Sequence, residues 1–180
     1  MVAPTENQAK AGEYGSMNPS DKPVRKRNRL ADFDYRSPNA YFITICTAQR
    51  KNLFWHAVGA TTGRPSEQHL SPAGRIVQSA IEEIPQRYPA YVLEHYVIMP
   101  NHVHLLLRIQ ADANGRPMVA PTVSTVIAQM KGVVSKQLGT PIWQKSFHDH
   151  VVRTVQDFQD IWKYIEENPL RWAEDDLYTP

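Results

Sequence analysis

The chain has 180 residues, 42% hydrophobic, 21% charged and 9% aromatic, values typical of a globular protein that exclude collagen-like and coiled-coil sequences. Its length predicts one domain, no apolar run approaches the ~20 residues that span a bilayer, and the first ten residues lack the apolar stretch of a secretory signal. The single cysteine, Cys46, excludes an intrachain disulfide, and the net charge of +2 gives no direct sign of a polyanionic partner.

The charge is unevenly distributed, because residues 1–29 hold six of the 20 basic residues and three of the 18 acidic ones. Five of these six basic residues cluster near the end of the segment and include Arg25, Lys26 and Arg27. The segment has few large apolar side chains, so burial cannot offset the entropy cost of ordering it. We expect a disordered basic N-terminal arm, which either only aids solubility or contacts phosphate groups. Residues 30–180 are expected to form a single domain with a net charge of −1.

The predicted domain begins with a strand and a helix. Residues 41–47 (YFITICT) are β-branched and aromatic, which is typical of a buried strand. A helix is expected over 71–84, because Ser71 can cap it and Pro72 suits its first turn. Pro85 is expected to end this helix.

Two more strands and a second helix follow. The runs 91–99 and 102–109 are apolar and are separated by the turn signal Pro100–Asn101, so they predict an antiparallel hairpin. Residues 123–138 carry apolar side chains at helical spacing, and Gly139 is expected to end that helix.

The last helix is predicted over 155–167, with Thr154 and Asp157 as a capping pair, after an extended or irregular segment at 142–152. The order strand, helix, strand, strand, helix, short strand and helix predicts an α+β fold. We expect a ferredoxin-like or RRM-like antiparallel sheet with the helices on one face.

His102 and His104 form the first candidate site. Residues i and i+2 of a strand point to the same face, so the two imidazoles would stand side by side while Val103 and Leu105 face the core. Neutral imidazoles in this arrangement are good ligands for a divalent metal. The alternative is two polar side chains on a solvated face.

Tyr164 and Asn168 form the second candidate site, because residues four apart share one face of a helix. Tyr164 falls on the flank of the apolar stripe, where its hydroxyl can reach a surface groove; the stripe consists of Phe158, Ile161, Trp162 and Ile165. The alternative is a half-buried tyrosine without a chemical role.

A third candidate is the segment HDH at 148–150, which repeats the spacing of the first histidine pair. With Trp143, Lys145 and Arg153 nearby, the imidazoles of His148 and His150 could contact phosphates or bases. They could equally form a rival metal site or serve only in structural hydrogen bonds. Trp143 could stack on unpaired bases or belong to the core.

Three segments in this order resemble a known family: YVIMPNHVHLLL (96–107), IWQKSFHDHVVR (142–153) and WKYIEENPLRW (162–172). The first is similar to the HUH motif, two histidines flanking one hydrophobic residue, of the single-tyrosine transposases. Together the segments resemble the REP-associated tyrosine transposases, over about residues 33–172. The polar loops at 57–70 and 110–121 depart from the shorter members of that family.

The resemblance implies roles for particular residues. His102 and His104 match the metal ligands, Asn168 falls where the family places its third ligand, and Tyr164 matches the nucleophile on a C-terminal helix. The implied cofactor is Mg²⁺ or Mn²⁺, and the implied partner is single-stranded DNA or a DNA hairpin. DNA contacts are expected from Arg25, Lys26, Arg27, Trp143, Lys145, His150 and Arg153. The resemblance further implies a cytoplasmic, nucleoid-associated protein without a membrane partner, and it allows a homodimer.

The implied activity is that of a metal-dependent transposase or endonuclease. It would cleave and rejoin single-stranded DNA next to hairpins through a 5′-phosphotyrosine intermediate. Two alternatives stay open: a domesticated protein that binds hairpins without cutting them, and a hydrolytic metallonuclease that uses a metal-bound water and forms no protein–DNA adduct.

Overall fold

The computed structural model describes three stretches of the chain, residues 38–56, 70–111 and 120–179. The predicted arm over residues 1–29, with Arg25, Lys26 and Arg27, lies outside these stretches, as does most of the two predicted loops. Within the three stretches, no helix is long and apolar enough to cross a membrane.

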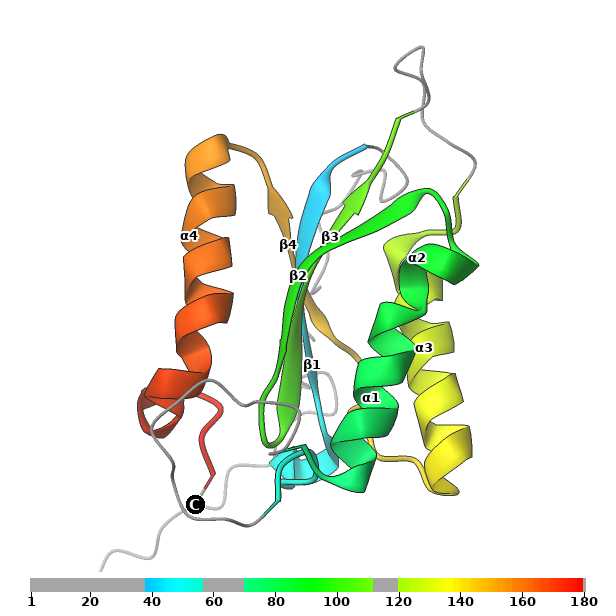
Figure 1. Ribbon diagram of the computed structural model, residues 1–180, viewed down its shortest axis with the longest axis vertical. Coiled ribbons are helices and arrows are strands. Elements are labelled where there is room, and N and C mark those ends of the chain that lie inside the picture. Colours follow the sequence, from blue (N-terminus) through cyan, green and yellow to red (C-terminus); the bar gives the residue numbers. More distant parts are fainter. Residues whose placement is uncertain (1–37, 57–69, 112–119, 180) are drawn as a thin grey trace, which may run out of the picture.

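The elements follow in the predicted order (Figure 1). The strands are β1 (Ala40–Cys46), β2 (Tyr91–Ile98), β3 (His102–Ile109) and β4 (His148–Val152). The longer helices are α1 (Pro72–Glu82), α3 (Val123–Leu138) and α4 (Val155–Glu167). Three short helical segments complete the set, α2 (Ile84–Arg87) and the 3-10 segments η1 (Ala48–Arg50) and η3 (Asn168–Glu174).

The helix ends are fixed by local chemistry. The Ser71 hydroxyl accepts a hydrogen bond from the backbone N–H of Gly74 at 3.0 Å, and the Thr154 hydroxyl accepts one from Asp157 at 3.0 Å. These caps satisfy N–H groups that have no partner within the first turn of a helix. Gly139 ends α3 with φ of +68°, a left-handed conformation that glycine adopts without strain. The predicted starts of α1 and α4 are therefore confirmed.

Pro85 does not end the first helix in the predicted way. α1 already ends at Glu82, and Pro85 lies in the first turn of α2. A proline is tolerated there, because the backbone N–H that it lacks would have had no partner within the helix.

The four strands form one antiparallel sheet in the order β2-β3-β1-β4. The order of elements and strands is that of a ferredoxin-like fold followed by one more helix, and the predicted α+β class is confirmed. The register brings Thr44 of β1 opposite His104 of β3 on one side and His148 of β4 on the other. Residues directly opposite one another share a face of the sheet.

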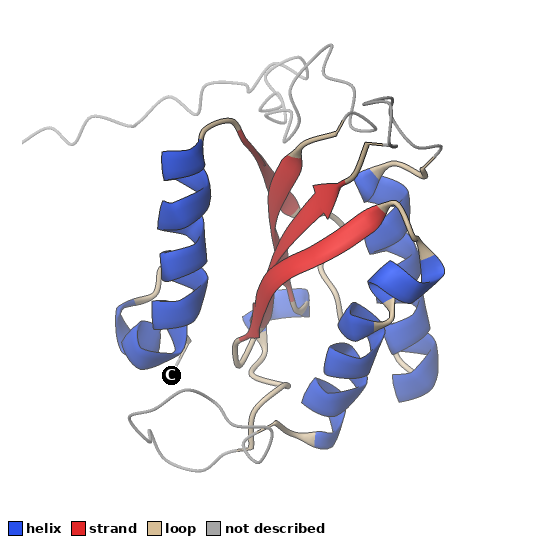
Figure 2. Ribbon diagram, turned by 45° about the horizontal axis from the view of Figure 1, so that its top comes forward, coloured by secondary structure: helices blue, strands red, loops and turns tan. Residues whose placement is uncertain are grey.

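Helices cover both faces of the sheet, which corrects the prediction of one covered face (Figures 1 and 2). α1 and α3 pack on the face that carries Val103, Leu105 and Leu107, whereas α4 packs on the face that carries Leu106. The physical reason is that each of the four strands places an apolar residue on the second face, so this face cannot be left to water; the residues are Ala40, Val97, Leu106 and Val152. The face under α4 is also the one that the two histidines share.

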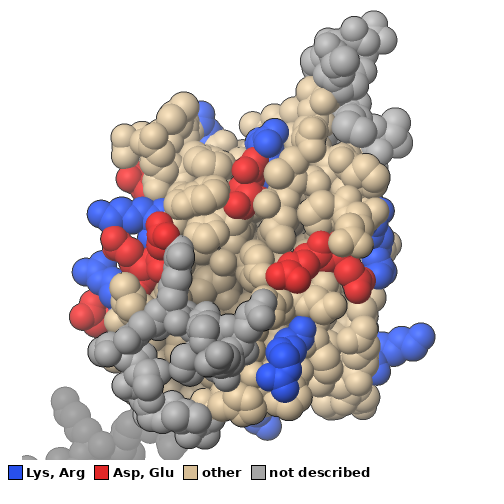
Figure 3. Space-filling model, viewed as in Figure 1, with Lys and Arg blue, Asp and Glu red and all other residues tan. Residues whose placement is uncertain are grey.

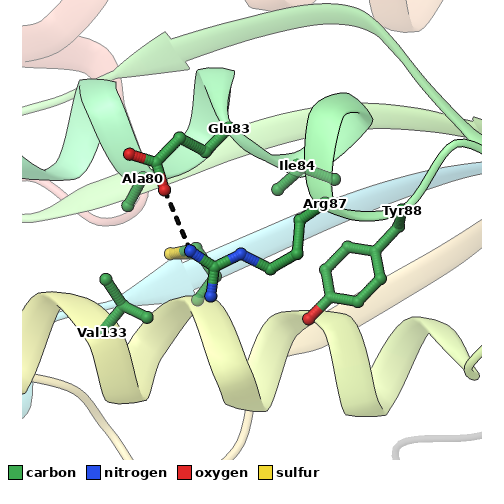
Figure 4. A pocket seen from close by; sticks show the side chains of 7 residues that line it. Ala80, Glu83, Ile84, Arg87, Tyr88 and Val133 are labelled. Atoms are coloured by element: carbon green, nitrogen blue, oxygen red, sulfur yellow. Dashed lines mark hydrogen bonds and ion pairs between the residues drawn. The ribbon is translucent and has the colours of Figure 1, made fainter.

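The helix layer opposite α4 contains a small hollow between α1–α2 and α3 (Figure 4). It has a volume of about 240 Å³, an apolar floor, and the ion pair between Arg87 and Glu83 at its mouth. The hollow lies across the sheet from the histidines and takes no part in their chemistry.

Candidate functional site

His102 and His104 lie at the start of β3, on the face of the sheet that α4 covers. Both side chains are buried, and their Nε2 atoms face each other at 3.0 Å. Two ring nitrogens that bind one ion at about 2.1 Å each and about 90° apart are separated by about this distance. The solvated-face alternative therefore does not describe this pair.

Asn101 determines which nitrogen of His102 carries the proton. The Nδ2 of Asn101 donates to the backbone carbonyl of Leu177 at 2.8 Å, and a carbonyl can only accept. The Oδ1 of Asn101 is therefore the atom that lies 2.8 Å from Nδ1 of His102, so Nδ1 must be the donor. The lone pair of neutral His102 is then on Nε2, which points at His104 and is free to bind a metal.

Thr44 holds the second imidazole. Its hydroxyl lies 2.9 Å from Nδ1 of His104. A hydroxyl both donates and accepts, so it supports either neutral tautomer of His104. One of these tautomers leaves Nε2 of His104 with a lone pair beside that of His102.

Burial keeps both imidazoles neutral. Desolvation lowers the pKa of His102 to about 4, although the nearby Asp175 carboxylate acts in the opposite direction. Desolvation also lowers the pKa of His104 well below its usual value, and the charge of His102 adds to this effect. Both rings are consequently in the ligand form at neutral pH.

Tyr164 projects from α4 toward the histidines. Its ring lies 5.3 Å from that of His104 and 5.9 Å from that of Phe42, and 46% of the residue is exposed. Partial burial raises the pKa of the Tyr164 hydroxyl, as does the charge of Asp175, whereas a hydrogen bond from the Asn168 side chain acts to lower it. The phenol is therefore protonated at neutral pH, within reach of solvent and of a substrate.

Asn168 follows α4 directly and is buried. Its backbone N–H donates to the carbonyl of Tyr164, which fixes its place one turn further along the chain. Its Oδ1 is buried and has no hydrogen-bond partner in the part of the chain that the structure describes. A buried amide oxygen without a partner is costly, and it is also a suitable ligand for a hard cation.

Asp175 is a member of the site that the sequence did not reveal. Its Oδ2 lies 3.9 Å from Nε2 of His102, and its side chain is 4% exposed. Ligand atoms of His102, His104 and Asp175 all lie within 4.8 Å of one another. Asp175 follows the last helical segment without any periodic pattern, so only the folded chain brings it to β3.

An open cleft of about 540 Å³ lies beside these residues. Its lining includes one basic residue and four acidic ones, together with the two C-terminal candidates; the set is Tyr164, Glu167, Asn168, Arg171, Glu174, Asp175 and Asp176. Basic and acidic side chains are also mixed over α4, without a continuous basic surface in that view (Figure 3). A phosphate that enters this cleft needs a counter-charge that these side chains do not supply.

The HDH segment lies on β4, at the edge of the sheet. His150 contacts Oδ2 of Asp157 at 2.8 Å, and the same oxygen accepts from the backbone N–H of Arg153. These contacts match the alternative of structural hydrogen bonds, here at the start of α4. The His102, His104 and Asp175 group is the sole set of three such ligands in the described stretches, so the HDH segment forms no rival to it there.

Of the other predicted DNA contacts, Lys145 and Arg153 are exposed. Trp143 is buried and packs on Phe54 with ring centroids 5.3 Å apart, as its alternative role in the core requires. Trp143 therefore belongs to the core and offers no exposed ring on which a base could stack.

Comparison with known proteins adds an independent finding. Residues 39–168 match the model of the family described as "Transposase IS200 like". A Haemophilus influenzae protein of uncharacterized function is 28% identical over 174 residues, which cover 86% of this chain and 93% of that protein.

A solved structure described as a REP-associated tyrosine transposase bound to a REP hairpin has the same fold. It superposes with a TM-score of 0.57 at 18% identity and covers 84% of this chain and 88% of its own. The family match ends at Asn168, so Asp175 lies beyond it.

Proposed function

Because the chain belongs to the IS200-like transposase family, we propose that it cleaves and rejoins single-stranded DNA in a metal-dependent reaction with Tyr164 as the nucleophile. The observation that carries this proposal is the contact between Tyr164 and His104, whose ring centroids are 5.3 Å apart. A hydroxyl nucleophile thus lies beside a buried pair of neutral imidazoles within one chain.

In the proposed reaction, the oxygen of Tyr164 attacks the scissile phosphorus, and the bond from phosphorus to the 3′ oxygen breaks. The phenol loses its proton, and the departing oxygen takes up a proton to become a free 3′-hydroxyl. The 5′ phosphate is then esterified to Tyr164. One phosphodiester has replaced another, so a second 3′-hydroxyl can reverse the step and join strands without ATP.

His102, His104 and Asn168 would hold the metal ion, as Mg²⁺ or Mn²⁺. The fit rests on the Nε2 lone pair of His102 and on the buried Oδ1 of Asn168, which lacks a partner among the described residues. Imidazole nitrogen suits Mn²⁺ better than Mg²⁺. When bound, such an ion polarises the phosphate and offsets the negative charge of the cleft.

The proposed substrate is single-stranded DNA next to a hairpin. Support comes from the solved structure with the same fold, which is described as bound to a REP hairpin. Exposed Lys145, His150 and Arg153 would contact phosphates along the β4 edge of the sheet. Arg25, Lys26 and Arg27 would add contacts from the N-terminal arm.

The test is a covalent-adduct assay. The protein is incubated with a labelled single-stranded oligonucleotide that carries a hairpin, with Mn²⁺ or Mg²⁺, and the products are separated under denaturing conditions. We expect a protein–DNA adduct that requires the metal and disappears in Tyr164→Phe. Tyr178→Phe is the matched control, since Tyr178 is also partly exposed and lies near the same end of the molecule.

Three outcomes would contradict the proposal. An adduct that persists in Tyr164→Phe would exclude this residue as the nucleophile. Metal-dependent cleavage without an adduct would favour a hydrolytic metallonuclease. Tight hairpin binding without any cleavage would favour a DNA-binding protein that has lost the reaction.

A further inference from the structure

The chain beyond η3 returns to the histidine end of the sheet. Residues 175–179, here called the C-terminal strap, are bound there by side chains that are distant in sequence. Asn101 donates to Leu177, Arg50 donates to the carbonyl of Asp176 at 3.3 Å, and Asn52 donates to the carbonyl of Thr179 at 3.0 Å. The strap is therefore a docked part of the fold.

The two carboxylate oxygens of Asp175 have different surroundings. Oδ1 accepts the backbone N–H of Leu177 at 2.6 Å, which fixes the rotation of the side chain. Oδ2 is buried and has no hydrogen-bond partner in the described stretches, and it lies 3.9 Å from Nε2 of His102. A buried, unpaired carboxylate oxygen is unfavourable unless a cation or donor compensates it.

We propose that Asp175 is a direct ligand of the metal ion, so that the C-terminal strap supplies a carboxylate to the histidine pair. The inference rests on the proposed function and extends its metal site beyond the residues of the family match. Three facts carry it: Oδ2 is buried without a hydrogen-bond partner in the described stretches, it lies 3.9 Å from the ligand nitrogen of His102, and Oδ1 is already satisfied by Leu177.

A carboxylate changes what the site binds. Two neutral imidazoles and one amide oxygen carry no charge, whereas Asp175 adds one negative charge at the ion. Two histidines and one carboxylate with open positions form a donor set that first-row transition metals favour, and it suits Mn²⁺ over Mg²⁺. Asn168, whose side chain interacts with the Tyr164 hydroxyl, would link the site of the ion to the nucleophile.

The strap also acts on the site through Asn101. The same amide that accepts from His102 donates to Leu177 and to the hydroxyl of Thr179. Docking of the strap therefore both delivers Asp175 and orients the first imidazole. Metal binding and strap docking are consequently coupled, because each favours the same arrangement of Asn101 and Asp175.

The test measures Mn²⁺ binding by the full-length protein without DNA, by isothermal titration calorimetry and by loss of the free Mn²⁺ signal in electron paramagnetic resonance. We expect Asp175→Asn, which keeps the Oδ1 acceptor and the shape, to weaken Mn²⁺ affinity at least about tenfold. Asp176→Asn removes the same charge from the neighbouring exposed residue. The Mn²⁺ affinity of Asp176→Asn should change less than about threefold, because solvent and salt screen the effect of an exposed charge on the ion.

Folding is checked on the same samples by thermal unfolding with and without Mn²⁺. Asp175→Asn should unfold as cooperatively as the parent protein without metal, and it should lose most of the rise in unfolding temperature that Mn²⁺ gives the parent. His102→Ala should lose binding altogether.

The outcomes separate this inference from the proposed function. Equal affinities of Asp175→Asn and the parent protein, with binding lost in His102→Ala, would overturn Asp175 as a ligand and leave the proposed function standing. Equal losses in Asp175→Asn and Asp176→Asn would also overturn it, since the effect would then be one of net charge. Failure of the parent protein to bind Mn²⁺ or Mg²⁺ would remove the metal from the proposed function itself.

Discussion

The side-chain amide of Asn101 accepts a hydrogen bond from Nδ1 of His102 at 2.8 Å. Because the other end of this amide is bonded to the C-terminal strap, the bond fixes the lone pair of His102 on Nε2, where it faces His104. A buried residue of the turn before β3 thereby sets the protonation geometry of the proposed metal site.

Replacing Asn101 by alanine should weaken metal binding without removing a ligand. The substitution leaves Nδ1 of His102 without its acceptor and detaches the strap at Leu177. We expect Mn²⁺ affinity to fall about 10- to 100-fold and the free energy of unfolding to fall by about 1–3 kcal/mol. Calorimetric titration and denaturant unfolding measure the two effects.

Asn52→Ala is the matched control for this variant. Asn52 also bonds the strap, through the carbonyl and hydroxyl of Thr179, but it does not contact His102. Its Mn²⁺ affinity should fall much less than that of Asn101→Ala, because Asn101 still bonds both Leu177 of the strap and His102. If Asn52→Ala weakens binding as much as Asn101→Ala does, strap docking and not imidazole orientation is the cause.

The stability of the metal-free protein should depend on pH through His102. Burial lowers the pKa of His102 to about 4, whereas an unfolded histidine has a pKa of about 6.5. The unfolded state therefore binds the extra proton first as the pH falls. The free energy of unfolding is therefore highest above about pH 6.5. It falls progressively between about pH 6.5 and 4, by about 1.4 kcal/mol per pH unit.

Denaturant unfolding in the presence of a chelator, at pH values from 7 to 4, measures this slope. His102→Gln lacks the titrating group, so its free energy of unfolding should fall less steeply over the same range. Equal slopes for the two proteins would show that His102 is not held neutral in the folded state.

Much of the site follows from periodicity alone. The alternation of a strand placed His102 and His104 on one face, and helical spacing placed Tyr164 on the flank of α4. Asp175 could not be found in this way, because hydrogen bonds between partners 76 residues apart, such as that from Asn101 to Leu177, bring it to the site.

The position of α4 is the other feature that periodicity left undetermined. In the run HVHLLLRI, Leu106 is the single apolar residue on the face of the two histidines, and it does not reveal whether that face of the strand is covered. The second covered face became visible only in the packing of Leu106 of β3 in one apolar cluster with Ile161 and Ile165 of α4.

DNA binding should respond to salt through Arg153. If its exposed guanidinium contacts one phosphate, Arg153→Ala should reduce the slope of log affinity against log salt concentration by about 0.7 for single-stranded DNA. Fluorescence anisotropy at several salt concentrations measures this slope. Arg87→Ala is the control, because Arg87 lies in α2 across the sheet and pairs with Glu83; an equal change there would show a general effect of charge.

Packing of α4 on the sheet should affect the reaction more than comparable packing of α1 on the opposite face of the sheet. Ile165 of α4 and Ile81 of α1 are both buried, but Ile165 follows Tyr164 directly and packs on the histidine face, whereas Ile81 lies in the core opposite. Truncating either to alanine should cost about 2–5 kcal/mol of unfolding free energy. The rate of adduct formation should then distinguish the two variants.

For this measurement both variants are assayed at a temperature where each is fully folded, as judged by circular dichroism. Ile165→Ala should lower the rate of adduct formation at least about tenfold, because a shift of about 1 Å in the nucleophile has a large effect on in-line attack. Ile81→Ala should leave the rate within about twofold of the parent. Equal rates in both variants would mean that Tyr164 is positioned by its own contacts with Phe42 and His104 and not by the seating of α4 on the sheet.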